Sequence, residues 1–330
     1  MPNGYIPAIL YFIRDMIMEK KNPLGLSGAD CSKWAEGLNI PRGGETILYT
    51  SCMYQIMSYS ESLVEMLSKF MGDPTTSFPI KLARLSMKLK VNPVKVLSKF
   101  RRRRDYDEIV RKGAEILKKI GVSFGYLYEE EPYSGTLLYE YGFHDDFAVY
   151  ANEIYKFFKS KNVREIITID PHTADLLKNV YPEFVEGFDI EVRTFIEIVK
   201  EAIEDGRLRL KEESNETTLI YHDPCHFSKY LGIINEPRDV LKSIKGVELV
   251  EHDHSREMSV CCGGPIESLY PKLSKVMAKS RLDELLYTGA RKIVVACPIC
   301  LANFDRARDL IDEEYEVIDI IEFIYDHMGD

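Results

Sequence analysis

Five cysteines near the end of the chain have the residue type and the spacing of a metal site. The chain has 330 residues and seven cysteines, and five of these fall within the last 106 residues as a single cysteine, a CC pair and a CxxC. Five thiolates exceed the four ligands of a tetrahedral zinc, and thiolate ligands without interspersed histidines favour iron–sulfur chemistry. Unrelated core cysteines are the weaker interpretation, because CC and CxxC occur together. The predicted metal ligands are Cys225, Cys261, Cys262, Cys297 and Cys300.

Other residues in the same motifs are expected to support the metal. Gly263 and Gly264 carry no side chain, so the backbone can approach a bulky cofactor and direct N–H groups at sulfur. Pro298 separates the cysteines of the CxxC and precedes a predicted helix, whose positive end would face the thiolates. We therefore place Gly263, Gly264 and Pro298 beside the cofactor.

The composition excludes several classes of protein. With 43 basic and 53 acidic residues the net charge is −10, which argues against a general nucleic-acid binder. The cysteines are too sparse and uneven for a secreted disulfide scaffold. The first apolar stretch is interrupted by Arg14 and Asp15, and no run of about 18 uncharged apolar residues follows. These features predict a cytoplasmic protein, with peripheral attachment to the inner membrane face as the alternative.

Short apolar runs alternate with segments of helical period, a pattern typical of α/β proteins with parallel sheets. The strands that we expect cover residues 46–49, 122–127, 165–169, 190–192, 218–221, 247–250, 292–296 and 315–318. The helices that we expect cover residues 7–20, 106–120, 147–160, 194–204, 269–287 and 301–312. Because strands of such sheets present functional residues at their carboxyl ends, the three cysteine groups are expected to converge.

The sequence also contains an internal repeat. ILYTSC at 47–52 corresponds to LIYHDPC at 219–225, and IITIDPHT at 166–173 corresponds to IVVACPIC at 293–300. EPYSGT at 131–136 stands where the second half has its CCGG turn. This predicts two pseudo-repeated Rossmann-like lobes with short parallel sheets flanked by helices. The expected domains are residues 1–44 (helix and linker), 45–213 (a degenerate lobe) and 214–330 (the intact lobe).

The first lobe carries an insertion with a distinct charge. Residues 81–104, from Lys81 to Arg104, contain ten Lys and Arg and no acid, within a basic helical insertion at about 75–105. The other 306 residues then have a net charge of −20. Such a segment could dock on an acidic partner or an anionic membrane surface, or be a solvated face.

Three motifs in order resemble a known domain. YHDPCH (221–226), SVCCGGP (259–265) and ACPICLANF (296–304) are similar to the cysteine-rich (CCG) domain of heterodisulfide reductase B/D-type subunits. The same domain occurs in iron–sulfur subunits of glycolate, lactate and glycerol-3-phosphate oxidoreductases. The resemblance implies that the five cysteines hold one noncubane [4Fe–4S] cluster, which transfers electrons to or from a thiol, disulfide or sulfur-carrier substrate. It also implies a ferredoxin-like iron–sulfur subunit or a flavoprotein subunit as partner, because this chain has no ferredoxin motif of its own.

The first lobe departs from the family pattern. Its five ligand positions are Cys52, Tyr133, Ser134, Asp170 and Thr173, and a single thiolate cannot hold a cluster. We therefore expect a metal-free lobe with a scaffold or docking role. Cys52 is interpreted as a buried remnant or as a redox-active thiol that faces the second lobe. Cys31 is interpreted as incidental, with an extra metal ligand or a reactive thiol as the alternatives.

Two alternatives to the disulfide-reductase function stay open. The chain could be an electron-relay subunit of a flavin-dependent hydroxy-acid or succinate-type dehydrogenase, or an assembly protein that holds structural zinc. His226, beside Cys225, is a possible proton donor or an ordinary surface histidine, and no role is assigned to His172.

Overall fold

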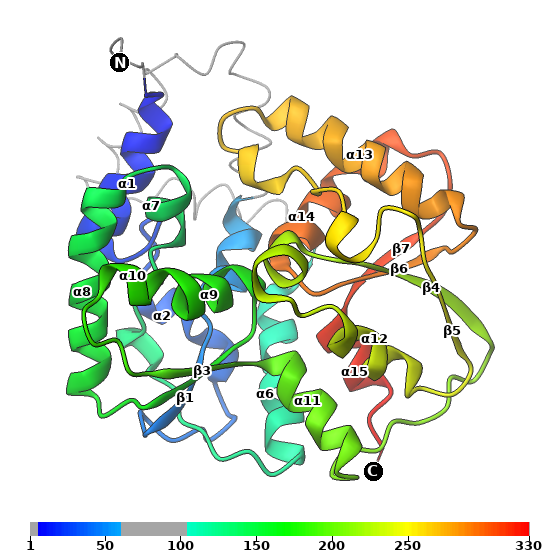
Figure 1. The fold of residues 1–330 in the computed structure, drawn as a ribbon, viewed down its shortest axis with the longest axis horizontal. Helices are drawn as coiled ribbons and strands as arrows, with labels where there is room; N and C mark the ends of the chain where they lie inside the picture. The colour runs from blue at the N-terminus through cyan, green and yellow to red at the C-terminus, as the bar shows by residue number, and fades with distance from the viewer. Residues whose placement is uncertain (1–5, 61–103, 330) are drawn as a thin grey trace.

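A computed structural model describes residues 6–60 and 104–329. It contains two parallel sheets flanked by helices, which confirms the predicted α/β class with two similar lobes (Figure 1). The first sheet has the order β1-β2-β3, formed by β1 (Thr46–Tyr49), β2 (Glu165–Thr168) and β3 (Glu191–Thr194). The second has the order β5-β4-β6-β7, formed by β4 (Thr217–His222), β5 (Val247–Val250), β6 (Lys292–Val295) and β7 (Glu316–Asp319).

Helices connect the parallel strands, as the alternating pattern predicted. In the N-terminal half they are α1 (Ala8–Lys20), α2 (Gly28–Cys31), η1 (Lys33–Ala35), α6 (Tyr106–Lys119), η2 (Tyr128–Glu130), α7 (Thr136–Glu140), α8 (His144–Ser160), α9 (Pro171–Asp175), η3 (Leu176–Val180), α10 (Tyr181–Phe184) and α11 (Phe195–Glu204), and residues 53–60 are also helical. In the C-terminal half they are η4 (His226–Leu231), α12 (Asn235–Lys242), η5 (Arg256–Met258), η6 (Gly264–Ile266), α13 (Pro271–Tyr287), α14 (Pro298–Ala307), η7 (Arg308–Leu310) and α15 (Ile320–Asp326).

The internal repeat is visible in both topology and backbone. β1, β2 and β3 follow one another across their sheet as β4, β6 and β7 do, and β5 adds an edge strand to the second sheet. Gly135 and Gly263 hold corresponding places, and both have the left-handed φ, 92° and 82°, that a side chain would disfavour. A third pair of segments, EVRTFIEIV at 191–199 and EVIDIIEFI at 316–324, forms β3–α11 and β7–α15.

Two expected elements differ from the structure. Residues 122–127 form no strand, and only Gly125 and Tyr126 make isolated bridges to Ile47 and Arg42. Gly125 crosses so close to the preceding loop that a Cβ would lie 1.6 Å from the Gly43 carbonyl oxygen. α14 begins at Pro298, three residues before the predicted start, because proline is well suited to the first turn of a helix.

The two lobes are packed against each other through helices and buried polar contacts. In Figure 1, α6 and α11 stand between the two sheets, and α6 packs against α15 while α11 packs against α12. The buried Tyr54 hydroxyl donates to Asp319 Oδ2 across the interface at 2.9 Å. Arg104 contacts Asp305 and Glu322 at 3.0 and 3.1 Å.

Much of the basic segment lies outside the described residues. Residues 81–103 are not described, so the predicted docking role of the segment stays a prediction. Its last residue, Arg104, is committed to the ion pairs with the C-terminal lobe. None of the described helices combines the length and the apolar character that a membrane span requires.

A buried acid in the first lobe generates a stability prediction. Glu131 accepts hydrogen bonds from the Thr50 hydroxyl and the Thr50 N–H, yet burial raises its pKa to about 8. In the unfolded chain its pKa is about 4.3, so the unfolded state loses the proton first as the pH rises. The contribution of Glu131 to stability is therefore fully present below about pH 4.3 and lost as the pH rises to about 8.

The melting temperature of Glu131→Gln, measured by circular dichroism, should therefore rise relative to that of the unchanged protein as the pH increases from 5 to 8.5. The reason is that only the unchanged protein loses the contribution of the protonated Glu131. Glu130→Gln is the matched control, because Glu130 is exposed and paired with Lys161. Parallel pH profiles of the Glu131 variant and the unchanged protein would show that Glu131 is ionised in the folded state.

Candidate metal centre

The topology of the second sheet brings the cysteine motifs together. β4 and β6 are adjacent and parallel, with Tyr221 opposite Val294 and His222 opposite Val295. Cys225 follows the end of β4, and Cys297 follows the end of β6 at the start of α14. Since both strands end at the same sheet edge, the first and last cysteine motifs meet there, as the sequence predicted.

The CCGG loop completes this arrangement. The Gly263 N–H donates to Cys261 Sγ at 3.3 Å, and the Gly264 N–H donates to Cys262 Sγ at 3.4 Å. A Cβ on Gly264 would lie 2.2 Å from a methyl carbon of Ile299, so only glycine allows this loop to approach α14. Pro298 is buried at the first position of α14. The loop therefore presents two sulfurs and two backbone donors on one side of the site.

The five thiols form one connected group. Cys225 contacts Cys261, Cys261 contacts Cys262, Cys262 contacts Cys300, and Cys300 contacts Cys297 through sulfur hydrogen bonds. Cys225 and Cys261 are half-buried, whereas the other three are buried.

Proximity divides the thiols into two electrostatic classes. Hydrogen bonds from Cys225 and Cys262 lower the pKa of Cys261. Burial alone would raise the pKa of Cys297, but hydrogen bonds from Cys300 and His172 lower it well below its usual value. The pKa values of Cys225, Cys262 and Cys300 are raised, because each faces a neighbouring thiolate. A cation at this point would favour ionisation of all five, since metal ligation requires thiolates.

Two histidines that the sequence did not assign lie against the cysteines. His172, from α9 of the first lobe, is 3% exposed and hydrogen bonds to Cys297. Burial alone would lower its pKa, but Glu140 and Cys297 raise it well above the usual value. His222, the last residue of β4, has a ligand atom within 4.8 Å of the Cys262 and Cys300 sulfurs.

The internal repeat could have indicated that His172 is important, because it aligns His172 with a residue of the CxxC motif. In DPHT it occupies the position that Ile299 occupies in CPIC, at the start of the corresponding helix. His222 is distinguished by its electrostatics, because burial and the neighbouring Arg281 lower its pKa to about 3. A neutral His222 can accept the Arg281 Nε–H at Nδ1, 3.4 Å away.

His226, the residue suggested by sequence as a proton donor, faces the first lobe. Its Nδ1 lies 2.7 Å from Asp175 Oδ2 and its Nε2 lies 3.3 Å from Glu140 Oε1. Its ring is 3.9 Å from the ring of His172, centroid to centroid. His226 therefore belongs to a polar cluster at the lobe interface that adjoins the cysteines through His172.

A buried ion pair fixes the loop that carries Cys225. Both Asp223 carboxylate oxygens accept hydrogen bonds from Arg238, at 2.6 and 2.8 Å, and both residues are 1% exposed. The Arg256 N–H also donates to Asp223, and the Ser259 hydroxyl donates to its carbonyl oxygen. Asp223 thus links the turn before Cys225 to the segment before Cys261.

At the corresponding positions of the first lobe, protein groups pair with some of the polar atoms, whereas Asp170 Oδ2 and Thr173 Oγ1 are buried without a hydrogen-bond partner. Ser134 hydrogen bonds with Ser51 and Thr136, and Asp170 caps the start of α9 by accepting the Thr173 N–H. Tyr133 is buried.

The structure corrects part of the sequence-based interpretation of the two remaining cysteines. Cys31 and Cys52 are both buried and form a disulfide across a sequence separation of 21. Cys31 is therefore not incidental, and Cys52 is not a free thiol facing the other lobe.

Comparison with known proteins agrees with this geometry. Residues 219–305, which include all five cysteines, match the model of the cysteine-rich domain named CCG. The C-terminal lobe is thus similar to the cysteine-rich (CCG) domain over these residues. The likeness that three short motifs indicated is thereby confirmed.

Two curated relatives carry iron–sulfur or reductase names. The chain is 33% identical over 215 residues to the probable iron-sulfur-binding oxidoreductase FadF of Bacillus subtilis, covering 63% of this chain and 30% of that protein. It is 31% identical over 222 residues to a subunit of the dihydromethanophenazine:CoB--CoM heterodisulfide reductase of Methanosarcina barkeri, covering 66% of this chain and 54% of that protein. The chain thus spans about half or less of the length of these relatives.

A solved structure supports the fold alone. A hypothetical protein from Helicobacter pylori superposes with a TM-score of 0.50 at 13% identity, over 68% of this chain and 47% of that one.

The Asp223–Arg238 pair generates a prediction for the site's scaffold. Asp223→Asn removes the buried one of the two carboxylates that pair with Arg238 and leaves Glu251 as the remaining counter-charge, so the free energy of unfolding should fall by about 1–3 kcal/mol in urea titrations. Asp239→Asn on α12 is the matched control, because the Asp239 side chain is 52% exposed and should change stability by less than about 0.5 kcal/mol. A loss below about 1 kcal/mol for Asp223→Asn would mean that the ion pair does not fix this loop.

Proposed function

We propose that the chain is the iron–sulfur subunit of a heterodisulfide-reductase-like oxidoreductase. The observation that carries the proposal is the convergence of five thiols at the carboxyl edge of one parallel sheet. The names of the curated relatives support the same class. The substrate that we propose is a thiol, a disulfide or a sulfur carrier.

The residues present fit an iron–sulfur cluster. The five cysteines offer five sulfur ligands, which suit iron–sulfur chemistry. The N–H groups of Gly263 and Gly264 donate hydrogen bonds to two of these sulfurs. Five ligands, instead of four, support a cluster of the noncubane [4Fe–4S] type. The proposed ligands are Cys225, Cys261, Cys262, Cys297 and Cys300.

When bound, the cluster would supply one-electron transfer at a buried site. The chain's own residues prepare that site. His172 hydrogen bonds to Cys297 and the glycine N–H groups hydrogen bond to Cys261 and Cys262, contacts that stabilise negative charge on sulfur. The half-buried Cys225 and Cys261 lie closest to solvent and mark the side from which a sulfur substrate could approach.

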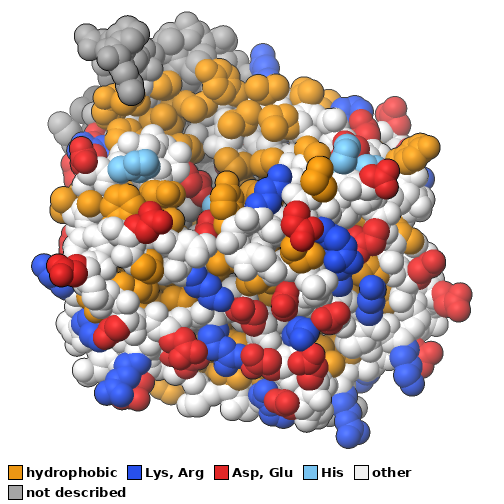
Figure 2. All heavy atoms as spheres, viewed as in Figure 1, with side chains coloured by type: hydrophobic (Ala, Val, Ile, Leu, Met, Phe, Trp, Pro, Cys, Tyr) orange, Lys and Arg blue, Asp and Glu red, His pale blue; other side chains and the backbone are white. Residues whose placement is uncertain are grey.

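An exposed apolar surface beside the cysteines supports a partner subunit. Figure 2 shows hydrophobic side chains gathered along the upper part of the molecule, while charged side chains of both signs cover its lower half. Near the CCGG loop, Met258 is 68% exposed and Val260 is 40% exposed, and Leu273 and Val276 follow on α13. Such a patch is typical of a protein interface. We propose that a ferredoxin-like or flavin-containing subunit docks there and exchanges electrons with the cluster.

Cluster binding is tested by iron analysis of the full chain purified without oxygen. We expect about four iron and four sulfide per chain. Cys297→Ser should lose most of this iron, whereas Cys52→Ser, which breaks only the disulfide, should retain it. A colourless protein that holds one zinc per chain would instead favour a zinc-binding assembly protein.

A second experiment separates a substrate-binding site from an electron relay. Addition of a small thiol to the oxidised protein should change the electron paramagnetic resonance spectrum if substrate sulfur reaches the cluster. An unchanged spectrum would favour the relay subunit of a flavin-dependent hydroxy-acid or succinate-type dehydrogenase. Proteins that copurify with the chain would then identify the complex.

A further inference from the structure

Three side chains from both lobes converge beside the cysteines without belonging to them. Glu140 ends α7, His172 lies in α9, and His226 begins η4, so two come from the first lobe and one from the second. Glu140 Oε1 is 2.8 Å from His172 Nδ1 and 3.3 Å from His226 Nε2. One ligand atom from each residue lies within 4.8 Å of the other two.

In each imidazole, the ring nitrogen that does not face Glu140 hydrogen bonds to an acceptor outside the three residues. His226 Nδ1 is 2.7 Å from Asp175 Oδ2. His172 uses Nδ1 toward Glu140, which leaves its other ring nitrogen for the hydrogen bond with Cys297. A metal ion here would displace the protons on His172 Nδ1 and His226 Nε2, and the lone pairs of both nitrogens would then point at the ion beside Glu140 Oε1. Metal-binding histidines are fixed by acceptors in this same way.

The spacing and charge of the trio suit a single divalent ion. Zinc–nitrogen and zinc–oxygen bonds of about 2.0–2.2 Å at tetrahedral angles place neighbouring ligand atoms about 3.3 Å apart. The two distances from Glu140 Oε1 approach this value. Glu140 and Asp175 supply two carboxylates in an interior position, which attracts a cation.

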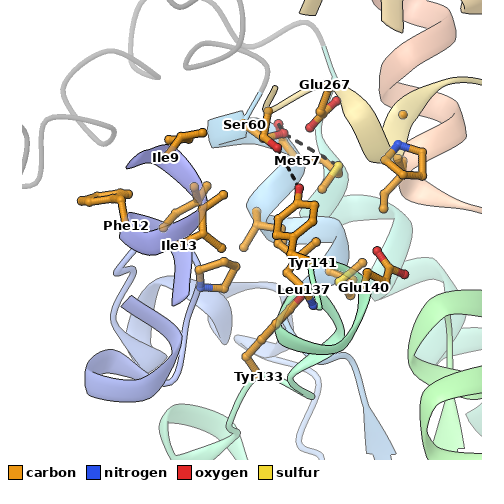
Figure 3. A pocket seen from close by; sticks show the side chains of 18 residues that line it. Ile9, Phe12, Ile13, Met57, Ser60, Tyr133, Leu137, Glu140, Tyr141 and Glu267 are labelled. Carbon is orange, nitrogen blue, oxygen red and sulfur yellow. Dashed lines mark hydrogen bonds between the residues drawn. The ribbon is translucent and has the colours of Figure 1, made fainter. Parts of the chain in front are cut away.

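We propose that Glu140, His172 and His226 form a mononuclear site for a divalent transition ion of the zinc type, separate from the five cysteines. Three protein ligands of this kind leave a fourth position open to water or a small ligand. Glu140 also lines an apolar pocket with Tyr133, Leu137 and Tyr141, where Figure 3 shows it at the edge of the cavity. The ion would join the two lobes, and none of its three ligands is one of the five cysteines.

Zinc binding to the full chain tests this site. Equilibrium dialysis against Zn²⁺ should show one more ion per chain in the unchanged protein than in Glu140→Gln, whose affinity should fall at least about 100-fold. Metal held by the cysteines is common to both proteins and cancels in the difference. Glu284→Gln is the matched control, because Glu284 belongs to the more exposed His252–His254–Glu284 group and should leave the tight ion in place.

X-ray absorption at the zinc edge identifies the ligands of this ion. The ion lost in Glu140→Gln should have nitrogen and oxygen neighbours at about 2.0–2.1 Å and no sulfur at about 2.3 Å. Equal zinc content in the unchanged protein and the Glu140 variant, or sulfur around the lost ion, would overturn the proposal.

A second variant decides the question if Glu140→Gln does not fold. Asp175→Asn keeps the shape of the group that orients His226 but weakens its acceptor, so zinc affinity should fall about 10–100-fold. Because it removes no metal ligand, the zinc-edge spectrum should keep its nitrogen and oxygen shell. Zinc affinity equal to that of the unchanged protein would overturn the proposal.

Discussion

The parallel pairing of β4 with β6 is the constraint on which the metal centre depends. It brings the ends of two strands to one edge of the sheet and thereby places the Cys225 turn beside the start of α14. Gly263 and Gly264 let the third cysteine motif close over this edge, since a Cβ at Gly264 would collide with Ile299. The Asp223–Arg238 ion pair holds the turn in register with the loop before Cys261. The positions of the three cysteine motifs are therefore fixed by strand pairing, by the two glycines and by a buried ion pair.

Electrostatics explains how a cation would act at this position. Five thiols in contact and largely buried cannot all ionise without one, and the pKa values divide accordingly into lowered and raised groups. The first lobe contributes to the same balance through His172, which hydrogen bonds to Cys297. A lobe whose own ligand positions are occupied by Tyr133, Ser134 and Asp170 thus remains electrostatically coupled to the intact site. The interface between the lobes therefore adjoins the five cysteines.

Local patterns predicted the elements well, and long-range contacts explain what they missed. Strand periodicity placed β1 and β4, and the cysteine spacing identified one group of five thiols. The segment 122–127 was apolar enough for a strand, but Gly125 crosses another loop and makes only isolated bridges. The Cys31–Cys52 disulfide and the His172–Cys297 contact join residues 21 and 125 positions apart. Neither has a sequence signature of its own, although the repeat aligns His172 with Ile299.

We propose that the five cysteines of the C-terminal lobe bind one iron–sulfur cluster. A crystal structure of the full chain, prepared without oxygen and measured at the iron absorption edge, tests it most directly. We expect a single group of iron peaks bonded to Cys225, Cys261, Cys262, Cys297 and Cys300, and no iron at Cys52. Iron bound elsewhere, or no iron peak among these five sulfurs, would contradict it.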